Sequence, residues 1–195
     1  DLVITGCTND AEVSTSAQIW GVAGICGLVH NVGDNYKITD NTNNGDVTFD
    51  KKAAANQVFC GGILAIAEAP VEVTGNINEG NVKSISGRTS DATGVAGGIV
   101  GTVFRSSGRK GSTNRTTVIS ENYNFGDVTL EAGKDEATGV AAGIVGNFNI
   151  QYGTVDDKNT VTLNQNRSVG AITNTVGSTG AIFATCSSAS ALTIT

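Results

Sequence analysis

A ten-residue pattern recurs along the whole chain and limits the folds that the chain can adopt. The copies begin at residues 4, 38, 73, 119 and 161, so successive copies are separated by 34, 35, 46 and 42 residues. Position one is Ile or Val, position two is Thr or Ser, and the pattern closes on Val or Ile, after two extra residues in the fifth copy, which closes on Ile172. The clearest copy reads Ile119-Ser-Glu-Asn-Tyr-Asn-Phe-Gly-Asp-Val128. Repeats of this length are typical of solenoids, in which each copy forms one unit of a stack.

A second element, rich in small residues, follows each copy. It reads Gly94-Val-Ala-Gly-Gly-Ile-Val-Gly101 in the third copy and Gly139-Val-Ala-Ala-Gly-Ile-Val-Gly146 in the fourth, and looser versions surround Ile25, Ile63 and Ile182. The spacing varies mainly through the loops. Because similar residues recur in register, we expect coils that stack like on like, ~4.8 Å apart, around a core of β-branched columns.

Short strands are favoured over helices by the composition. Val, Ile and Thr are bounded by Gly, Asn and Asp, the chain has one proline, and amphipathic helical periodicity is missing. We therefore expect an all-β, parallel β-solenoid of about five coils, one per 34–46-residue repeat, with two or three strands each. Parallel crossovers are mostly right-handed, so a right-handed β-helix is expected. Residues 1–195 form one domain, interpreted as a fragment of a longer repeat protein.

Asparagine marks two positions of the repeat. Position six is Asn in all five copies, and position four is Asn in four copies and Cys7 in the first. Buried amides need hydrogen-bond partners, and amides stacked between coils satisfy one another. The alternative is that Asn merely favours turns. The position-six pattern predicts a structural ladder of Asn9, Asn43, Asn78, Asn124 and Asn166.

Positions five and seven vary freely and are mostly polar, so we expect them to face solvent. In the fourth copy they carry an aromatic pair. Exposed rings among polar groups suit stacking on a sugar or contact with a protein, whereas the alternative is that neighbouring loops or a further domain cover them. The predicted ligand-binding residues are Tyr123, Phe125, Ile77, Glu79, Gln165 and Arg167.

The loop over residues 104–116 concentrates positive charge. It is rich in Gly and Ser and holds four of the twelve Lys and Arg residues of the chain. One interpretation is a contact loop for an anionic partner or glycan, and the other is a solvated, variable loop. The candidate contact residues are Arg105, Arg109, Lys110 and Arg115.

Motifs for catalysis or metal binding are missing from the sequence. The four cysteines form no CxxC or Cys/His spacing, so they are interpreted as buried filler, with a disulfide left open. Position nine carries Glu12, Asp46 and Asp127, whose like charges at coil spacing leave a bridging calcium ion as an alternative to a turn role. We expect no other cofactor, no catalytic residue, a packed Trp20 and a surface His30.

Charge and hydropathy argue against two classes of partner. The net charge is −6, whereas nucleic-acid binding usually needs a basic surface. The chain also contains no apolar run near the ~20 residues that a membrane-spanning helix needs. We therefore expect neither a nucleic acid partner nor a membrane span.

The pair of elements, Asn-Tyr-Asn-x-Gly-Asp-Val followed by Val-Ala-Gly-Gly-Ile-Val-Gly, resembles the GLUG motif of bacterial surface and secreted proteins. That motif also occurs in repeat regions of IgA-specific metallopeptidases, and Cys7 fits its common cysteine. The resemblance covers nearly the whole chain, but Ile replaces the Leu of the motif, and the glycines are degraded in copies one, two and five. It implies an extracellular or cell-surface bacterial protein. It carries no catalytic residues, and the chain has no H-E-x-x-H sequence.

The sequence supports three hypotheses for the function. The leading hypothesis is a non-enzymatic adhesin or stalk module that binds a host or microbial glycan, a surface protein, or further repeats of its parent chain. The second is a fragment of a β-helix polysaccharide-degrading enzyme, which would need clustered acids. The third is an ice-binding solenoid, suggested by the single Thr/Ser column at position two.

Overall fold

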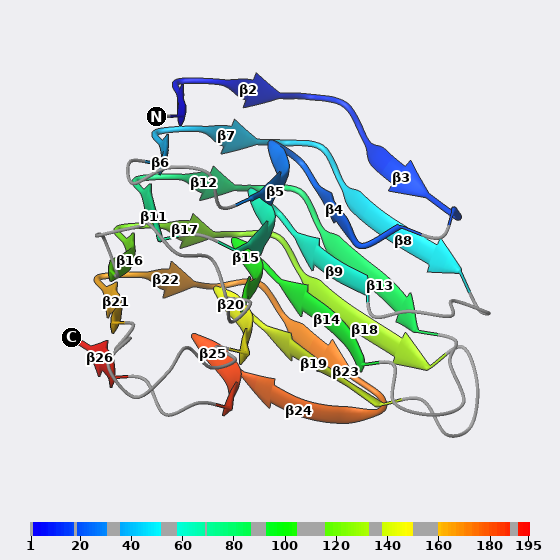
Figure 1. Cartoon of the computed structure of the whole chain (residues 1–195). Helices are drawn as coiled ribbons and strands as arrows, with labels where there is room; N and C mark the ends of the chain where they lie inside the picture. Colours follow the sequence, from blue (N-terminus) through cyan, green and yellow to red (C-terminus); the bar gives the residue numbers. More distant parts are fainter. Residues whose placement is uncertain are drawn as a thin grey trace.

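Parallel coils are stacked along the length of the molecule (Figure 1). The computed structural model describes residues 2–17, 19–30, 36–51, 58–68, 70–86, 93–104, 116–132, 138–149, 160–187 and 191–195. Regular structure within these residues is all β-strand, and the strands of successive coils pair in parallel. The prediction of an all-β parallel solenoid is confirmed.

Each of the first three coils contributes five strands rather than the two or three expected. Coil 1 contains β1 (Leu2–Thr5), β2 (Thr8–Asn9), β3 (Val13–Thr15), β4 (Gly21–Ala23) and β5 (Cys26–Val29). Coil 2 contains β6 (Tyr36–Thr39), β7 (Thr42–Asn43), β8 (Val47–Lys51), β9 (Val58–Gly61) and β10 (Leu64–Ala67). Coil 3 contains β11 (Val71–Thr74), β12 (Ile77–Asn78), β13 (Val82–Ser86), β14 (Thr93–Gly97) and β15 (Val100–Phe104).

The remaining strands repeat this order. Coil 4 contains β16 (Thr116–Ser120), β17 (Tyr123–Asn124), β18 (Val128–Ala132), β19 (Thr138–Ala142) and β20 (Val145–Asn149). Coil 5 contains β21 (Thr160–Asn164), β22 (Arg167–Ser168), β23 (Ile172–Asn174), β24 (Gly177–Gly180) and β25 (Phe183–Ser187). The last strand, β26 (Ala191–Ile194), pairs with β21 and begins a sixth turn of the stack.

Equivalent strands of successive coils form five sheets, which we number in chain order. Sheet 1 contains β1, β6, β11, β16, β21 and β26, and sheet 2 contains β2, β7, β12, β17 and β22. Sheets 3, 4 and 5 begin with β3, β4 and β5 and each hold five strands. The ten-residue pattern therefore spans sheets 1 and 2 and enters sheet 3, while the small-residue element forms sheets 4 and 5.

The register of sheet 1 corrects the alignment of the fifth copy. Leu163, not Val161, pairs with Ile119, and Ile172 pairs with Val128. The fifth copy therefore has the same length of ten residues as the others, and it starts 44 residues after the fourth (163 − 119). Every position of the fifth copy shifts as a result; in the asparagine columns, Asn166 belongs to position four, and position six is Ser168.

Position three turns the chain from sheet 1 into sheet 2. All five residues there have positive φ, at 64° for Gly6, 56° for Asp40, 69° for Gly75, 56° for Glu121 and 53° for Gln165. This left-handed conformation interrupts the extended backbone and makes a corner. It is one reason why each coil has more and shorter strands than expected.

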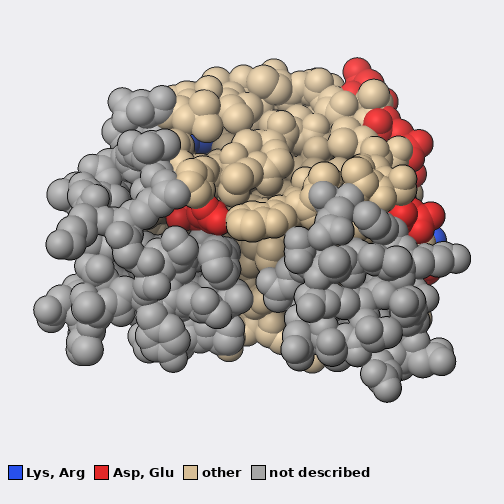
Figure 2. All heavy atoms as spheres, turned by 45° about the vertical axis from the view of Figure 1, so that its right-hand side comes forward, with Lys and Arg blue, Asp and Glu red and all other residues tan. Residues whose placement is uncertain are grey.

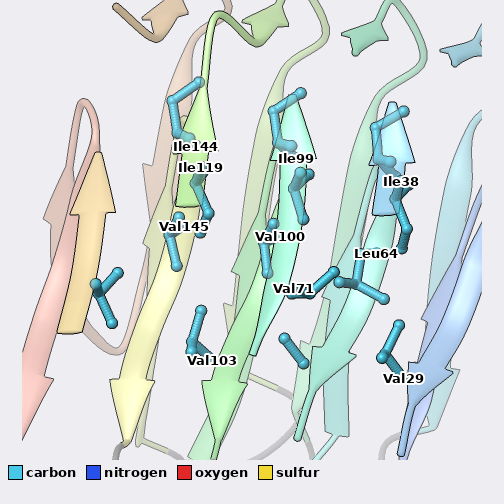
Figure 3. Close-up of a cluster of buried hydrophobic side chains, with 14 of the residues drawn as sticks. Val29, Ile38, Leu64, Val71, Ile99, Val100, Val103, Ile119, Ile144 and Val145 are labelled. Carbon is cyan, nitrogen blue, oxygen red and sulfur yellow. The ribbon is translucent and has the colours of Figure 1, made fainter. Parts of the chain in front are cut away.

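Apolar side chains fill the stack in three clusters. The largest lies between sheets 1 and 5, where Ile38, Ile119, Leu64 and Val100 are fully buried. Figure 3 shows successive coils contributing equivalent side chains to this cluster. The second cluster joins sheets 3 and 4, and the third joins sheets 4 and 5. The β-branched columns that the repeat predicted therefore do form the core.

The first coil exposes several large apolar residues. Leu2, Val3, Trp20 and Leu28 all lie in or beside its strands, and Trp20 is 60% exposed. The expectation that Trp20 is packed is therefore wrong. The physical reason is its place in the first coil, where only one side of each strand is covered by another coil.

Candidate functional site

Position four forms a continuous ladder of side-chain amides through coils 2 to 5, buried in coils 2 to 4 and half-buried in coil 5. The side-chain Nδ2 of each Asn donates to Oδ1 of the next, at 2.9 Å from Asn41 to Asn76, 3.0 Å from Asn76 to Asn122 and 2.9 Å from Asn122 to Asn166. The same Oδ1 atoms accept the backbone N–H of position four in the preceding coil. Cys7 has no side-chain amide; its backbone N–H keeps the bond to Asn41 Oδ1, and its thiol donates to the Thr5 carbonyl.

A second ladder runs through position six. Nδ2 of Asn9, Asn43 and Asn78 donates to Oδ1 of the next Asn at 2.7–2.8 Å, and Asn124 donates to the Ser168 hydroxyl at 3.3 Å. Asn166, predicted to end this ladder, instead ends the position-four ladder. The cause is the two-residue shift in the alignment of the fifth copy.

Side chains of the column at position nine accept hydrogen bonds from the backbone of the following coil. Asp46 Oδ1 accepts the Asn81 backbone N–H at 2.8 Å, and Asp127 Oδ1 accepts that of Ala171 at 2.8 Å. Asn81 Oδ1 does the same for Asp127. Among the described residues, no three His, Cys, Asp or Glu side chains form a group that could hold a metal ion. A calcium ion at Glu12, Asp46 and Asp127 stays a prediction.

The predicted aromatic pair stands on the outer face of sheet 2. Tyr123 is 40% exposed and Phe125 is 50% exposed. Their ring centroids are 6.4 Å apart and the ring planes differ by 11°, so the rings are nearly parallel. The inward residue between them, Asn124, is buried and anchored in the position-six ladder, which fixes the backbone that presents both rings.

The neighbours of this pair differ in one residue from the prediction. Ile77 and Arg167 pair with Tyr123 from coils 3 and 5, and Glu79 and Val169 occupy position seven beside Phe125. Gln165 lies instead at the left-handed corner, position three, outside these two columns. Sequence reasoning missed Val169, which is 51% exposed; the equal ten-residue length of all copies was the signal that could have found it.

We call the six residues of positions five and seven in coils 3 to 5 the lateral patch: Ile77, Glu79, Tyr123, Phe125, Arg167 and Val169. Both charged members are exposed. Ion pairs within the described residues join Lys37 to Glu72, Lys83 to Glu131 and His30 to Glu68, and none of them uses a charge of the lateral patch. The predicted contact residues Arg105, Arg109, Lys110 and Arg115 lie outside the described residues.

The single histidine forms an ion pair, and the four cysteines are free. His30 Nδ1 pairs with Oε2 of Glu68, whose side chain is buried, at the end of sheet 5. All four cysteines are free; Cys60 is buried, Cys26 is half-buried, and Cys7 and Cys186 are exposed. Burial raises the pKa of the Cys60 thiol to about 12, so it is an unreactive core side chain.

Acidic side chains dominate the charged part of the surface drawn in Figure 2, where they gather mainly along one edge of the described residues. This distribution agrees with the net charge of −6. Within the described part of the chain, no helix has the length and apolar character needed to cross a membrane.

Comparison with family models finds no match to this chain, and comparisons with curated proteins and with solved structures likewise find none. The resemblance to the GLUG motif therefore stays a prediction from the sequence.

Proposed function

We propose that the chain is a non-enzymatic adhesin or stalk module that binds a glycan or a protein through the lateral patch. The observation that carries this proposal is the exposed, nearly parallel pair Tyr123 and Phe125 on the side of coil 4. Aromatic faces of this kind suit the apolar face of a sugar ring or an apolar side chain of a protein.

The position of the pair within the stack supports a functional rather than an incidental exposure. Among the described residues, the other exposed large apolar ones are Leu2, Val3, Trp20 and Leu28 in or beside coil 1, Val169 in coil 5, where sheet 2 ends, and Ile194 in the last strand. Ends of a stack expose apolar groups because one neighbouring coil is missing. Tyr123 and Phe125 have coils on both sides, so an end effect does not account for them.

An extracellular bacterial setting is part of the same proposal. The support is the resemblance of the repeats to GLUG motifs together with the solenoid architecture, which offers long lateral surfaces for partners. In this setting the inward columns hold the coils in register, and the outward columns are free to vary with the ligand.

Binding to a glycan array and to a panel of surface proteins tests the proposal. The double variant Tyr123→Ala/Phe125→Ala should lose at least about tenfold in affinity for any ligand found, since buried aromatic anchors dominate such contacts. A matched control, Thr42→Ala/Asn44→Ala, changes positions five and seven of coil 2 and should bind as wild type does. Equal binding by wild type and the aromatic double variant would contradict the proposal.

A further inference from the structure

The lateral patch has a particular order of apolar and charged residues. It occupies two columns over three coils, with coils ~4.8 Å apart and positions five and seven ~6.6 Å apart along the strand direction. Ile77 and Val169 lie at two opposite corners, with the aromatic pair between them. Glu79 and Arg167 lie at the other two corners. An apolar diagonal is thus flanked by one negative and one positive charge.

We infer that the partner of the lateral patch is a second copy of this chain. This inference rests on the proposed function and names its protein partner. A two-fold axis in the plane of the patch, through its centre and inclined by about 45° to the strands, crosses the two apolar diagonals face to face. The same axis brings Glu79 of each copy close to Arg167 of the other. A patch with this property is self-complementary, as an isologous dimer requires.

Charge complementarity favours a second copy over an unrelated apolar partner. Glu79 and Arg167 are both exposed, and within the described residues neither takes part in an ion pair. In the dimer each of them gains one opposite charge, so two Glu79–Arg167 pairs form at the rim of the aromatic contact. Facing charges of opposite sign speed encounter and fix the orientation of the two surfaces.

The size of the patch sets the strength of the dimer. Six residues per copy are far fewer than the roughly 20–30 residues per partner of a standard interface. We therefore expect reversible association with a dissociation constant of about 10⁻⁵ to 10⁻⁴ M. Many copies on apposed surfaces would bind far more tightly than one pair through multivalency. Weak homophilic contact of this kind fits an adhesin module.

Sedimentation equilibrium of charge-exchanged variants tests the intermolecular pairs. Glu79→Arg places two arginines opposite each other and Arg167→Glu places two glutamates, so each variant alone should dimerise about tenfold more weakly than wild type. An equimolar mixture of the two variants should regain association, because every facing pair is again opposite in sign. The combined variant Glu79→Arg/Arg167→Glu should also regain it.

Controls separate this effect from general electrostatics and from folding. Lys37→Glu makes the same charge change as Arg167→Glu but lies on sheet 1, where Lys37 pairs with Glu72, so it should leave dimerisation unchanged. Thermal unfolding should show that the variants at the exposed patch remain folded.

Two results would overturn the inference. The first is wild-type protein that stays monomeric at concentrations up to about 10⁻³ M, well above the expected dissociation constant. The second is a mixture of the single variants that associates no better than either alone. If either occurs while an array ligand is lost in the Tyr123→Ala/Phe125→Ala variant, the proposed function stands and only the self-partner is refuted.

Discussion

At the scale of single residues, the corner at position three holds non-glycine residues in a left-handed backbone conformation that L-residues disfavour. Glycine occupies it in two copies, but Asp40, Glu121 and Gln165 adopt the same positive φ. An L-residue in this left-handed region costs about 1–2 kcal/mol relative to its preferred conformations. Glycine has no such penalty, although its unfolded chain is more flexible by about 0.5–1 kcal/mol.

Replacing Glu121 by glycine should therefore stabilise the protein slightly. The relief of strain exceeds the added flexibility, and we expect the free energy of unfolding to rise by about 0.5 kcal/mol. Urea denaturation measures this change. Glu79→Gly, at an exposed position without positive φ, is the matched control and should lower stability. A loss of stability at Glu121 equal to that of the control would refute the account of the corner.

At the scale of elements, the glycine at the corner between sheets 4 and 5 is explained by the ladder that it faces. The glycine before each central isoleucine lies against position six of the following coil. A Cβ atom on Gly98 would lie 2.4 Å from Cγ of Asn124 and 2.2 Å from the Gly143 carbonyl oxygen. The column changes to alanine only at Ala181, in the last complete coil, where the described residues place no further position-six side chain above it.

Gly98→Ala should for this reason be strongly destabilising. The added methyl group would displace either backbone or a buried ladder amide, which we expect to cost more than about 2 kcal/mol of unfolding free energy. Gly27→Ala is the control, since the nearest atom to its Cβ would be the Gly21 carbonyl oxygen at 3.9 Å. Chemical denaturation of both variants should separate them clearly; similar midpoints would contradict the proposed contact.

At the scale of the whole molecule, the repeat predicted the solenoid, the stacking of like residues and the exposure of the aromatic pair. It did not predict the alignment of the fifth copy. Val161-Thr162 and Leu163-Asn164 both present an apolar residue followed by a polar one. A shift of two residues keeps every side chain on the same face of a strand, so hydrophobic alternation cannot distinguish the two alignments. The shift assigned Gln165 to the lateral patch and left out Val169.

The two asparagine ladders connect successive coils. Each Asn-to-Asn bond is donated to the following coil, while position-four amides also donate to the position-one carbonyl of the preceding coil. Inward polar columns therefore fix the register of the stack. The six side chains of the lateral patch lie outside these ladders, which leaves them free to serve binding.

This division between inward and outward columns is tested most directly by comparing two asparagine variants. Asn76 Oδ1 accepts the Asn41 backbone N–H and side-chain amide, and its Nδ2 donates to Asn122. Asn44 is exposed and its side chain donates to Asp10. The unfolding free energy, measured in urea, should fall by at least about 3 kcal/mol in Asn76→Ala, which leaves several buried groups unpaired. It should change by no more than about 0.5 kcal/mol in Asn44→Ala. Equal losses in the two variants would contradict the account.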